Sequence, residues 1–196
     1  MWFGTNPAHG VGLTARLPFT VTVGPSSPKL DHTAFPAVVE GPIPFHLLAI
    51  WALPRPSYVR AVLRALEVYA DFLKSAPSIV VGDFNCFPEW RGKAPSKAHV
   101  ELAHRLRDDF ALLSAYHVAP GYDPAVPDTP TYFFRWAESQ PFHIDYCFIP
   151  ASWRDAVRSV RVGAFAEEEW GSDHRPVLVD LDPRLIPGAD PSRRSG

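Results

Sequence analysis

Apolar and polar residues alternate along this chain in short runs that predict strands more often than helices. Residues 19–23 place Phe or Val at every second position, which is typical of a half-buried strand. Residues 45–52 are almost wholly apolar, which predicts a central strand covered on both faces. The aliphatic residues 78–82 predict another buried strand. Similar patterns predict shorter strands at residues 10–16, 37–40, 110–116, 131–135, 142–149, 157–165 and 177–181.

Two segments have the periodicity of helices. In residues 57–75, apolar residues recur at helical spacing behind Ser57, a residue type that caps helix N-termini. Residues 97–108 repeat the pattern more weakly. Because the first helix lies between two predicted buried strands, the middle of the chain is a strand–helix–strand unit. Loops are predicted at residues 2–10 and 120–130, and a helical turn at 151–154.

Length and composition describe one globular domain. The 196 residues are 46% hydrophobic and carry a net charge of −2, so no overall basic excess indicates nucleic-acid binding. The 22 prolines favour short strands joined by rigid turns over long helices. We expect the domain to span residues 1–182, and the Pro-, Gly-, Ser- and Arg-rich residues 183–196 to form a disordered tail.

The cellular setting is predicted from features that the sequence lacks. Cys86 and Cys147 are the only cysteines, too few for a disulfide framework, so we expect a reduced, cytoplasmic setting. No run approaches the ~18–20 apolar residues that span a bilayer. Residues 1–4 have neither the basic nor the apolar region of a signal peptide. The expectation is a monomer with no membrane span.

The most informative stretch is the exit of the strand at residues 78–82. Gly82 permits a tight turn or a close backbone approach. Asp83 and Asn85 follow, and in an extended chain they point to the same side. A carboxylate and a carboxamide placed there can bind a hard metal ion or a phosphate. Since Asp and Asn are also favoured turn residues, this stretch alone leaves the choice between site and turn open.

Two further polar clusters are attached to predicted strands. In residues 142–149 the alternation turns His143, Asp145 and Cys147 to the face opposite the bulky apolar residues. An Asp in such a position is rarely left without a partner, although an exposed edge strand would also explain it. The third cluster, Asp173 and His174, lies in a loop that leads into the final strand.

The order and type of these clusters resemble those of a known superfamily. Its motifs appear here as Gly-Asp-Phe-Asn at 82–85, Pro-Thr-Tyr at 130–132, His-Ile-Asp-Tyr at 143–146 and Ser-Asp-His-Arg-Pro-Val at 172–177. Together they resemble the endonuclease/exonuclease/phosphatase superfamily, which has the deoxyribonuclease I-like fold. The resemblance implies a four-layer α/β sandwich of two mostly antiparallel β-sheets flanked by helices. It also implies cleavage of phosphate esters with a divalent metal, Mg²⁺ or Mn²⁺.

The same resemblance implies a role for each residue of the clusters. Asp83 resembles the residue that orients or deprotonates the attacking water, and Asn85 the amide that holds a phosphate oxygen in the transition state. Asp173 resembles a metal ligand. His174 resembles the phosphate-binding histidine, and Asp145 its carboxylate partner. A histidine beside a carboxylate keeps its charged form, which suits it to hold a phosphate.

The sequence departs from the family pattern near its start. The family begins with a strand bearing an Asn, then a helix, then a strand that ends in a metal-binding Glu. No segment matches these, so we expect about 40–50 residues of the family layout to be lacking at the N-terminus. Glu40 lies on a later strand and does not replace that Glu. Trp51 and Ala52 stand where the family often has His or Tyr, and neither does acid–base chemistry.

Three interpretations remain open at this point. The chain is a metal-dependent phosphoesterase, whole or incomplete; or an inactive homologue with a phosphate pocket at His174, Asn85 and Arg175; or a gene fragment that does not fold alone. The expected partner is a phosphate ester, either a nucleic acid, a lipid or sugar phosphate, or a small molecule. Residues that could stack on and neutralise a nucleic-acid strand follow the first motif, namely Trp90, Arg91 and Lys93.

Overall fold

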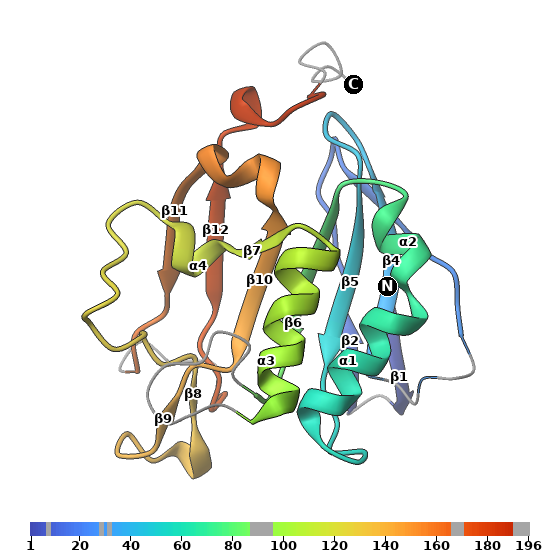
Figure 1. Cartoon of the computed structure of the whole chain (residues 1–196). Helices are drawn as coiled ribbons and strands as arrows, with labels where there is room; N and C mark the ends of the chain where they lie inside the picture. Colours follow the sequence, from blue (N-terminus) through green and yellow to red (C-terminus); the bar gives the residue numbers. More distant parts are fainter. Residues whose placement is uncertain (7–8, 28–29, 31–32, 87–95, 166–170, 190–196) are drawn as a thin grey trace.

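A mixed six-stranded sheet forms the centre of the computed structural model (Figure 1). The structure describes residues 1–189 except 7–8, 28–29, 31–32, 87–95 and 166–170. Five neighbouring strand pairs make the sheet, and only the β5–β6 pair is parallel. In sheet order the strands are β3 (Thr20–Val23), β4 (Ala34–Glu40), β5 (Phe45–Trp51), β6 (Ser78–Asp83), β10 (Asp145–Pro150) and β7 (Leu112–Ser114). The predicted α/β class with mostly antiparallel strands is confirmed.

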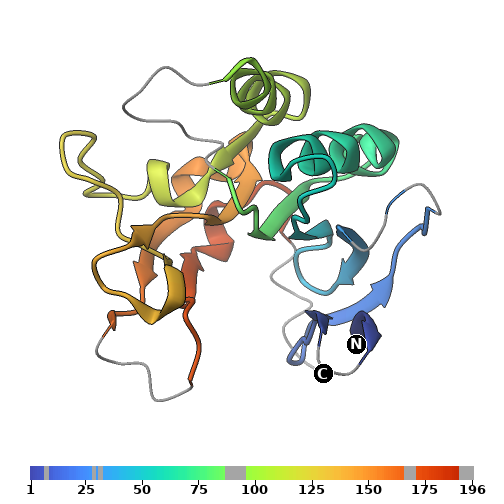
Figure 2. The same ribbon diagram turned by 90° about the horizontal axis from the view of Figure 1, so that it is seen from below.

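The remaining strands form antiparallel pairs. Figure 2 shows α1 and α3 on one side of the large sheet and the β1–β2 and β11–β12 pairs on the other. The β8–β9 pair is a short hairpin that projects from the body of the molecule. The bounds are β1 (Trp2–Asn6), β2 (His9–Gly12), β8 (Tyr132–Phe133), β9 (Pro141–Phe142), β11 (Val157–Val162) and β12 (Val177–Leu181).

The first predicted helix exists but is divided in two. Ser57 is its N-cap, and the Ser57 hydroxyl accepts a hydrogen bond from the Arg60 N–H at 3.3 Å. The helix breaks at Tyr69, whose φ of −102° and ψ of 19° are not helical. The pieces are α1 (Tyr58–Val68) and α2 (Ala70–Lys74). The apolar stripe of α1 is buried, as helical spacing predicted.

The second predicted helix also has a change of geometry near its end. It is α-helical as α3 (Lys97–His104), and the wider π-helical turn Arg105–Asp109 continues it. The predicted strand at 110–116 was too long. Only β7 is extended, and the short helix α4 (Ala115–Val118) follows directly.

The prediction of a loop at residues 2–10 was wrong, because this segment supplies β1 and the start of β2. Its glycines disfavour a strand when considered alone. In the structure they let two backbones approach: a Cβ at Gly4 would lie 2.4 Å from the His9 carbonyl oxygen. The Phe3 ring packs 5.2 Å from the Phe35 ring, which fixes the pair on the large sheet.

Two hydrophobic clusters hold the layers together. The larger one lies between the sheet and the helices, with Leu48, Leu66 and Phe148 fully buried. The smaller one surrounds Trp153, which lies in a 3₁₀ helix (Ala151–Ala156) at the predicted helical turn. No helix in the described part of the chain is long and apolar enough to cross a membrane.

The predicted disordered tail needs a correction at its start. Pro183–Leu185 forms a 3₁₀ helix, and the Asp182 carboxylate caps it by accepting the Arg184 N–H at 3.0 Å. Ile186 is 5% exposed and belongs to the smaller cluster. Burying such a side chain contributes about 2 kcal/mol toward ordering the segment. The described part of the domain therefore extends to residue 189, and residues 190–196 lie outside it.

Candidate functional site

The three polar clusters meet at one end of the large sheet, at the lower end of the view in Figure 1. Strand β6 ends there at Asp83. Strand β10 runs antiparallel to β6 and begins at Asp145, so the two aspartates lie directly opposite each other. The loop that leads into β12 brings His174 to the same place. Like charges opposite each other on a sheet are unfavourable, which is the first indication that this end serves binding rather than stability.

Asp83 and Asn85 form a compact pair that a local turn holds together. Asp83 Oδ1 accepts the Asn85 N–H at 2.8 Å, the local bond of an Asx-type turn. The Asn85 amide Nδ2 donates to Asp83 Oδ2 at 2.6 Å and reaches the Ala52 carbonyl at 3.3 Å. Asn85 has φ of 48°, so the extended conformation does not continue through it. The two side chains meet through this turn and not through strand alternation.

The residues around this pair explain its position. Gly82 has φ of +134°, and a Cβ on it would lie 2.1 Å from the Ile50 carbonyl oxygen, so only glycine fits. Phe84 is fully buried and packs against the rings of Tyr146 and Phe148 at 5.6 and 5.4 Å. Phe84 therefore anchors the Gly-Asp-Phe-Asn segment in the core and leaves its polar neighbours at the surface of the site.

Asp145 and His174 form the second element of the site. His174 Nδ1 lies 2.9 Å from Asp145 Oδ2 and 3.2 Å from Oδ1. Since a carboxylate only accepts, Nδ1 carries the hydrogen and Nε2 is left to face a ligand. The sequence places these two residues in separate motifs. The fold brings their side chains into contact, with Asp145 at the start of β10 and His174 in the loop before β12.

Backbone bonds fix the loop that carries Asp173 and His174. The Asp173 carbonyl accepts the Phe133 N–H at 2.8 Å, and the Arg175 N–H donates to the Thr131 carbonyl at 2.7 Å. The fully buried Thr131 hydroxyl accepts the N–H of Asp145 at 3.1 Å. One segment, residues 131–133, thus positions both Asp145 and the Asp173–His174 loop.

Arg175 is not part of an exposed phosphate pocket, and that prediction was wrong. Its residue exposure is 3%, and its guanidinium lies between the rings of Phe133 and Phe165, 4.9 Å from each centroid. Nη1 donates to the carbonyls of Ser172 and His174 at 2.8 and 3.0 Å. Arg175 therefore holds the loop from inside.

His143 also differs from its predicted place. The predicted strand 142–149 is interrupted, because β9 ends at Phe142 and β10 begins at Asp145. The Thr131 hydroxyl takes the Ile144 N–H at 3.0 Å at this break. His143 is 6% exposed, donates from Nδ1 to the Thr129 carbonyl at 2.6 Å, and packs among aromatic rings away from Asp145. Burial lowers the pKa of His143, partly offset by that hydrogen bond, so it is neutral at pH 7.

The surroundings raise the pKa of both Asp83 and His174, with different chemical consequences. Burial, followed by the charge of Asp145, raises the pKa of Asp83 to about 6 against the opposing effects of Asn85 and His174. Burial alone lowers the pKa of His174, but the hydrogen bond and charge of Asp145 outweigh it, and Asp83 and Asp173 add to the net rise. A carboxylate with a pKa near neutrality can accept a proton, and a charged imidazole can hold an anion.

The donor set fits a hydrated cation better than a closed metal cage. Among the residues that the structure describes, no three His, Cys, Asp or Glu side chains converge on one point. Mg²⁺ commonly keeps several waters and binds one or two carboxylates. Burial, followed by the charge of Asp145, raises the pKa of Asp83, and a cation bound nearby would oppose both effects. His174 binds Asp145 and Asn85 binds Asp83, which leaves Asp173 as the carboxylate of the three clusters that would hold such an ion.

Two tyrosines at the site were not singled out from the sequence as functional residues. The Tyr132 ring packs 4.6 Å from the His174 ring, and the two residues form an isolated backbone bridge. Burial raises the pKa of Tyr132, and the charges of Asp173, Asp83 and Tyr58 act in the same direction. The Pro-Thr-Tyr motif contained the signal for Tyr132. No motif contains Tyr58, which the sequence predicts only as the first residue of a helix.

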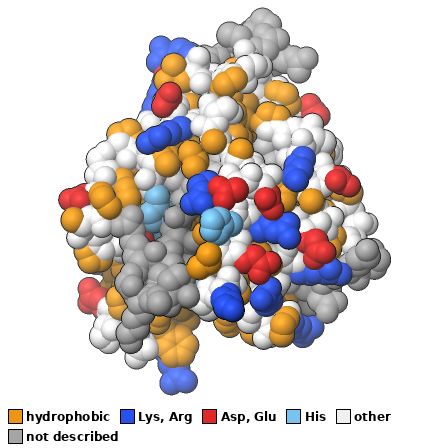
Figure 3. All heavy atoms as spheres, viewed as in Figure 1, with side chains coloured by type: hydrophobic (Ala, Val, Ile, Leu, Met, Phe, Trp, Pro, Cys, Tyr) orange, Lys and Arg blue, Asp and Glu red, His pale blue; other side chains and the backbone are white. Residues whose placement is uncertain are grey.

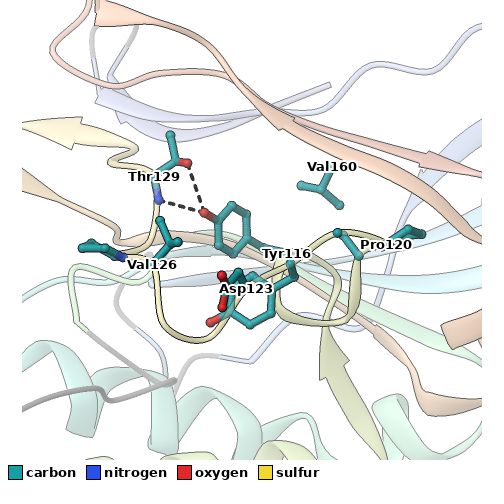
Figure 4. A pocket seen from close by; sticks show the side chains of 10 residues that line it. Tyr116, Pro120, Asp123, Val126, Thr129 and Val160 are labelled. Atoms are coloured by element: carbon teal, nitrogen blue, oxygen red, sulfur yellow. Dashed lines mark hydrogen bonds between the residues drawn. The ribbon is translucent and has the colours of Figure 1, made fainter.

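A separate pocket lies beyond His143, with a volume of about 280 Å³ (Figure 4). Tyr116 forms part of its wall, and its hydroxyl accepts the Thr129 N–H at 2.7 Å and donates to the Thr129 hydroxyl at 3.1 Å. None of the five candidate site residues lines it.

The predicted aromatic and basic loop with Trp90 lies outside the described residues.

Solved structures share this architecture. The chain matches a 3′ phosphatase (NExo) from Neisseria bound to a product DNA hairpin with a TM-score of 0.60 at 18% identity, over 83% of this chain and 70% of that one. It matches the 3′-5′ exonuclease (NExo) from Neisseria meningitidis with a TM-score of 0.58 at 20% identity, over 83% and 70%. The endonuclease domain of TRAS1, a telomere-specific non-LTR retrotransposon, gives 0.54 at 18% identity, over 84% and 67%. These similarities show the fold, which is deoxyribonuclease I-like.

The sequence itself shows the family. The model of the Endonuclease/Exonuclease/phosphatase family matches residues 2–174, so the chain belongs to that family. A structurally similar protein of unknown function from Enterococcus faecalis V583 is matched at 15% identity and a TM-score of 0.54, over 84% of this chain and 65% of that one. No curated protein matches the sequence.

Proposed function

We propose that this protein is a metal-dependent phosphoesterase with a nuclease-like site. The observation that carries the proposal is the meeting of the His174–Asp145 pair with the Asp83–Asn85 pair at one end of the sheet. One pair presents a cationic imidazole and the other a carboxylate that ionises near neutral pH. Phosphate ester hydrolysis needs both, because negative charge grows on the phosphate while water loses a proton.

We assign each residue the role that its motif implies, and the geometry supports these assignments. Asp83 accepts a proton from the attacking water, and the Asn85 amide, held 2.6 Å from Asp83 Oδ2, keeps the carboxylate oriented and can turn toward a phosphate oxygen. His174 Nε2 donates to another phosphate oxygen, while Asp145 maintains the ring orientation from Nδ1. A Mg²⁺ or Mn²⁺ ion held by Asp173 would neutralise the phosphate.

Hydrolysis of a generic phosphodiester in Mg²⁺ by the full chain tests the proposal. We expect turnover that EDTA abolishes and that added Mg²⁺ or Mn²⁺ restores. Asp83→Ala and His174→Ala should each lower kcat by at least about 100-fold, a loss of about 2.7 kcal/mol. Asp180→Ala, an exposed aspartate on β12, is the matched control and should retain activity. Activity that survives both site substitutions would reject the assigned site.

A second candidate function is phosphate binding without turnover. The absence of three converging metal-ligating side chains among the described residues favours it. Calorimetric titration with inorganic phosphate distinguishes the two candidates. A pure binding protein should bind phosphate equally well in EDTA and in Mg²⁺, and should lose binding on His174→Ala. Binding that depends on Mg²⁺ supports the phosphoesterase.

A further inference from the structure

The pocket beyond His143 is formed by α4, the loop that follows it and β11 (Figure 4). Two tyrosine rings and one carboxylate, Asp123, line it together with small loop residues. Val126 from the loop and Val160 from β11 add aliphatic surface. A volume of about 280 Å³ lies just below the roughly 300–1,000 Å³ that drug-sized ligands occupy, so the pocket suits a smaller molecule.

The two tyrosine rings, Tyr116 and Tyr122, form a corner of the pocket. Their centroids lie 5.6 Å apart, and the ring planes make an angle of 67°. The Tyr116 hydroxyl is bonded to Thr129, and the Tyr122 hydroxyl donates to Asp128 Oδ1 at 3.2 Å. Because both hydroxyls are already bonded inside the protein, the tyrosines offer mainly ring surface to a ligand. The face of an aromatic ring carries negative charge density, which attracts a cation.

The charge of the pocket also favours a cation. Asp123 is exposed, and among the described residues that line the pocket it is the only charged one. Asp123 Oδ1 accepts the Ala125 N–H at 2.8 Å. Within the described part of the chain, Oδ2 makes no hydrogen bond, so it can pair with a positively charged ligand.

Other classes of ligand fit this lining less well. An anion would meet the Asp123 carboxylate and no basic side chain from the described lining. A bare metal ion needs several converging ligands, and no three His, Cys, Asp or Glu side chains converge in the described residues. A neutral apolar molecule would cover part of the Asp123 carboxylate without compensating its lost hydration.

Hydrogen bonds fix the walls of the pocket before a ligand binds. The Tyr122 N–H donates to the Ala119 carbonyl, and the Val126 N–H to the Asp123 carbonyl, both at 3.1 Å. The Tyr116 hydroxyl holds the other end of the loop through Thr129. A site whose walls are already ordered loses less conformational entropy on binding.

A second pocket, between α1 and α3, has no comparable preference. It is larger, about 410 Å³, and four arginines and two glutamates line it. Figure 3 shows Lys and Arg side chains mixed with Asp and Glu on this face of the molecule. The Arg60–Glu101 and Arg64–Glu67 ion pairs, both at 3.0 Å, use these charges within the protein. Charges that are balanced in this way do not select one class of ligand.

We propose that the pocket between Tyr116 and Tyr122 binds a small quaternary or alkylated ammonium ion. The alkyl groups of the ion lie against the tyrosine rings and the two valines, and its charge lies beside Asp123. A cation–π contact and one exposed ion pair are each modest in energy, so we expect a dissociation constant in the millimolar range. The proposal goes beyond the phosphoesterase function and does not depend on it.

Choline and its carbon isostere, in which a quaternary carbon replaces the nitrogen, test the proposal. The two molecules have the same shape, and only choline is charged. Titration of the isotope-labelled full chain in EDTA, followed by NMR, measures both affinities and locates the perturbed amides. Choline should bind at least about 10-fold more tightly than the isostere, with the largest shifts in residues 116–129.

Three variants separate the contributions of the charge and the rings. Asp123→Asn keeps an oxygen for the Ala125 N–H but removes the charge, so it should reduce the preference for choline to about 3-fold. Tyr122→Leu should weaken choline binding by at least about 5-fold, and Tyr122→Phe, which keeps the ring, should retain most of the affinity. The matched control is Asp155→Asn, an exposed aspartate in the 3₁₀ helix Ala151–Ala156, which should bind choline as the wild type does.

Three results would overturn the proposal. They are equal affinity for choline and the isostere, shifts centred away from Tyr116 and Tyr122, and no saturable binding in the millimolar range. Circular dichroism melting identifies any variant that does not fold, and if Tyr122→Leu fails to fold, the isostere and Asp123→Asn still decide. Since choline is not a phosphate ester, failure of phosphodiester hydrolysis would reject the proposed function and leave this proposal standing.

Discussion

His174 Nδ1 lies 2.9 Å from Asp145 Oδ2, and this contact joins two parts of the fold that share no sheet. Asp145 begins β10 in the large sheet, whereas His174 precedes β12 in a two-stranded pair on the other side of the molecule. The contact raises the pKa of His174 against the effect of burial, and it orients the imidazole. The function of the site therefore depends on how the two sheets are placed relative to each other.

Asp145→Asn should lower kcat/KM by about 100-fold, equivalent to about 2.7 kcal/mol, because His174 loses the charge that favours its cationic form. Kinetics at pH 7 with Mg²⁺ measure this. Combining the change with His174→Ala should add little further loss, since both act on one group. The matched control is Asp128→Asn, because Asp128 lies 3.2 Å from His117 in a similar pair outside the site. Additive losses, or an equal loss in the control, would contradict the assigned role.

Local sequence was sufficient to predict those parts of the fold that are formed by neighbouring residues. The strand at β6, the final strand β12 and the N-cap at Ser57 all follow from local pattern. The residues of the Asp83–Asn85 turn were also identified, because the turn is made within three positions. The alternation at 142–149 failed, because the hydroxyl of Thr131, eleven or more positions away, interrupts the strand.

Non-local packing explains the remaining differences. Arg175 follows His174 in a motif, and nothing in the adjacent residues shows that Phe133 and Phe165 enclose its guanidinium. Gly4 and Gly10 are typical of a loop when the sequence is considered alone. In the structure, the lack of a side chain at each lets the neighbouring strand approach closely. The contact between the Tyr132 and Phe142 rings likewise exists only because β8 and β9 pair. Sequence identified the residue types of the site, and the fold determined which of them face a ligand.

The stability of the metal-free protein should depend on the ionisation of Asp83. Its folded-state pKa of about 6 lies above the ordinary value of 3.8 for an aspartate, so the folded state binds the proton more tightly than the unfolded state. Stability contributed by protonated Asp83 is present at low pH and is lost as pH rises toward and through about 6. Asp83→Asn should therefore stabilise the protein at pH 8 by about 2 kcal/mol, after allowance for partial exposure.

Urea denaturation in EDTA at pH 4 and pH 8 checks this expectation. The variant and the wild type should differ at pH 8 and converge at pH 4, where Asp83 is protonated in the folded state. Asp180→Asn is a suitable control, because that exposed carboxylate lies on β12 away from the site. Equal stability of Asp83→Asn and wild type at pH 8 would show that the buried, ionised Asp83 carboxylate does not lower the stability of the folded protein.

Gly82→Ala should destabilise the fold by at least about 3 kcal/mol, because strain in the backbone adds to a steric clash. The new Cβ would lie 2.1 Å from the Ile50 carbonyl oxygen, within the β5–β6 pair that positions Asp83. Gly121→Ala is the matched control: Gly121 also has positive φ, +82°, but nothing lies within 4 Å of its added Cβ. Urea midpoints should fall much further for Gly82→Ala, and similar midpoints for the two variants would contradict the close approach.

Arg175→Met should reduce activity by at least about 10-fold, because the carbonyls of Ser172 and His174 lose a shared donor. Each buried carbonyl left without its partner costs about 1–3 kcal/mol, and the loop relaxes to recover those bonds. The loss should appear in kcat more than in KM, since His174 is displaced from the position beside the phosphate that the proposed function gives it. Arg158→Met is the comparison variant, because Arg158 is an exposed arginine that pairs with the buried Asp182 at 3.0 Å, at the C-terminal end of β12. If Arg175→Met melts at a lower temperature but keeps wild-type kcat, the hydrogen bonds from Arg175 to the two carbonyls stabilise the fold without orienting His174.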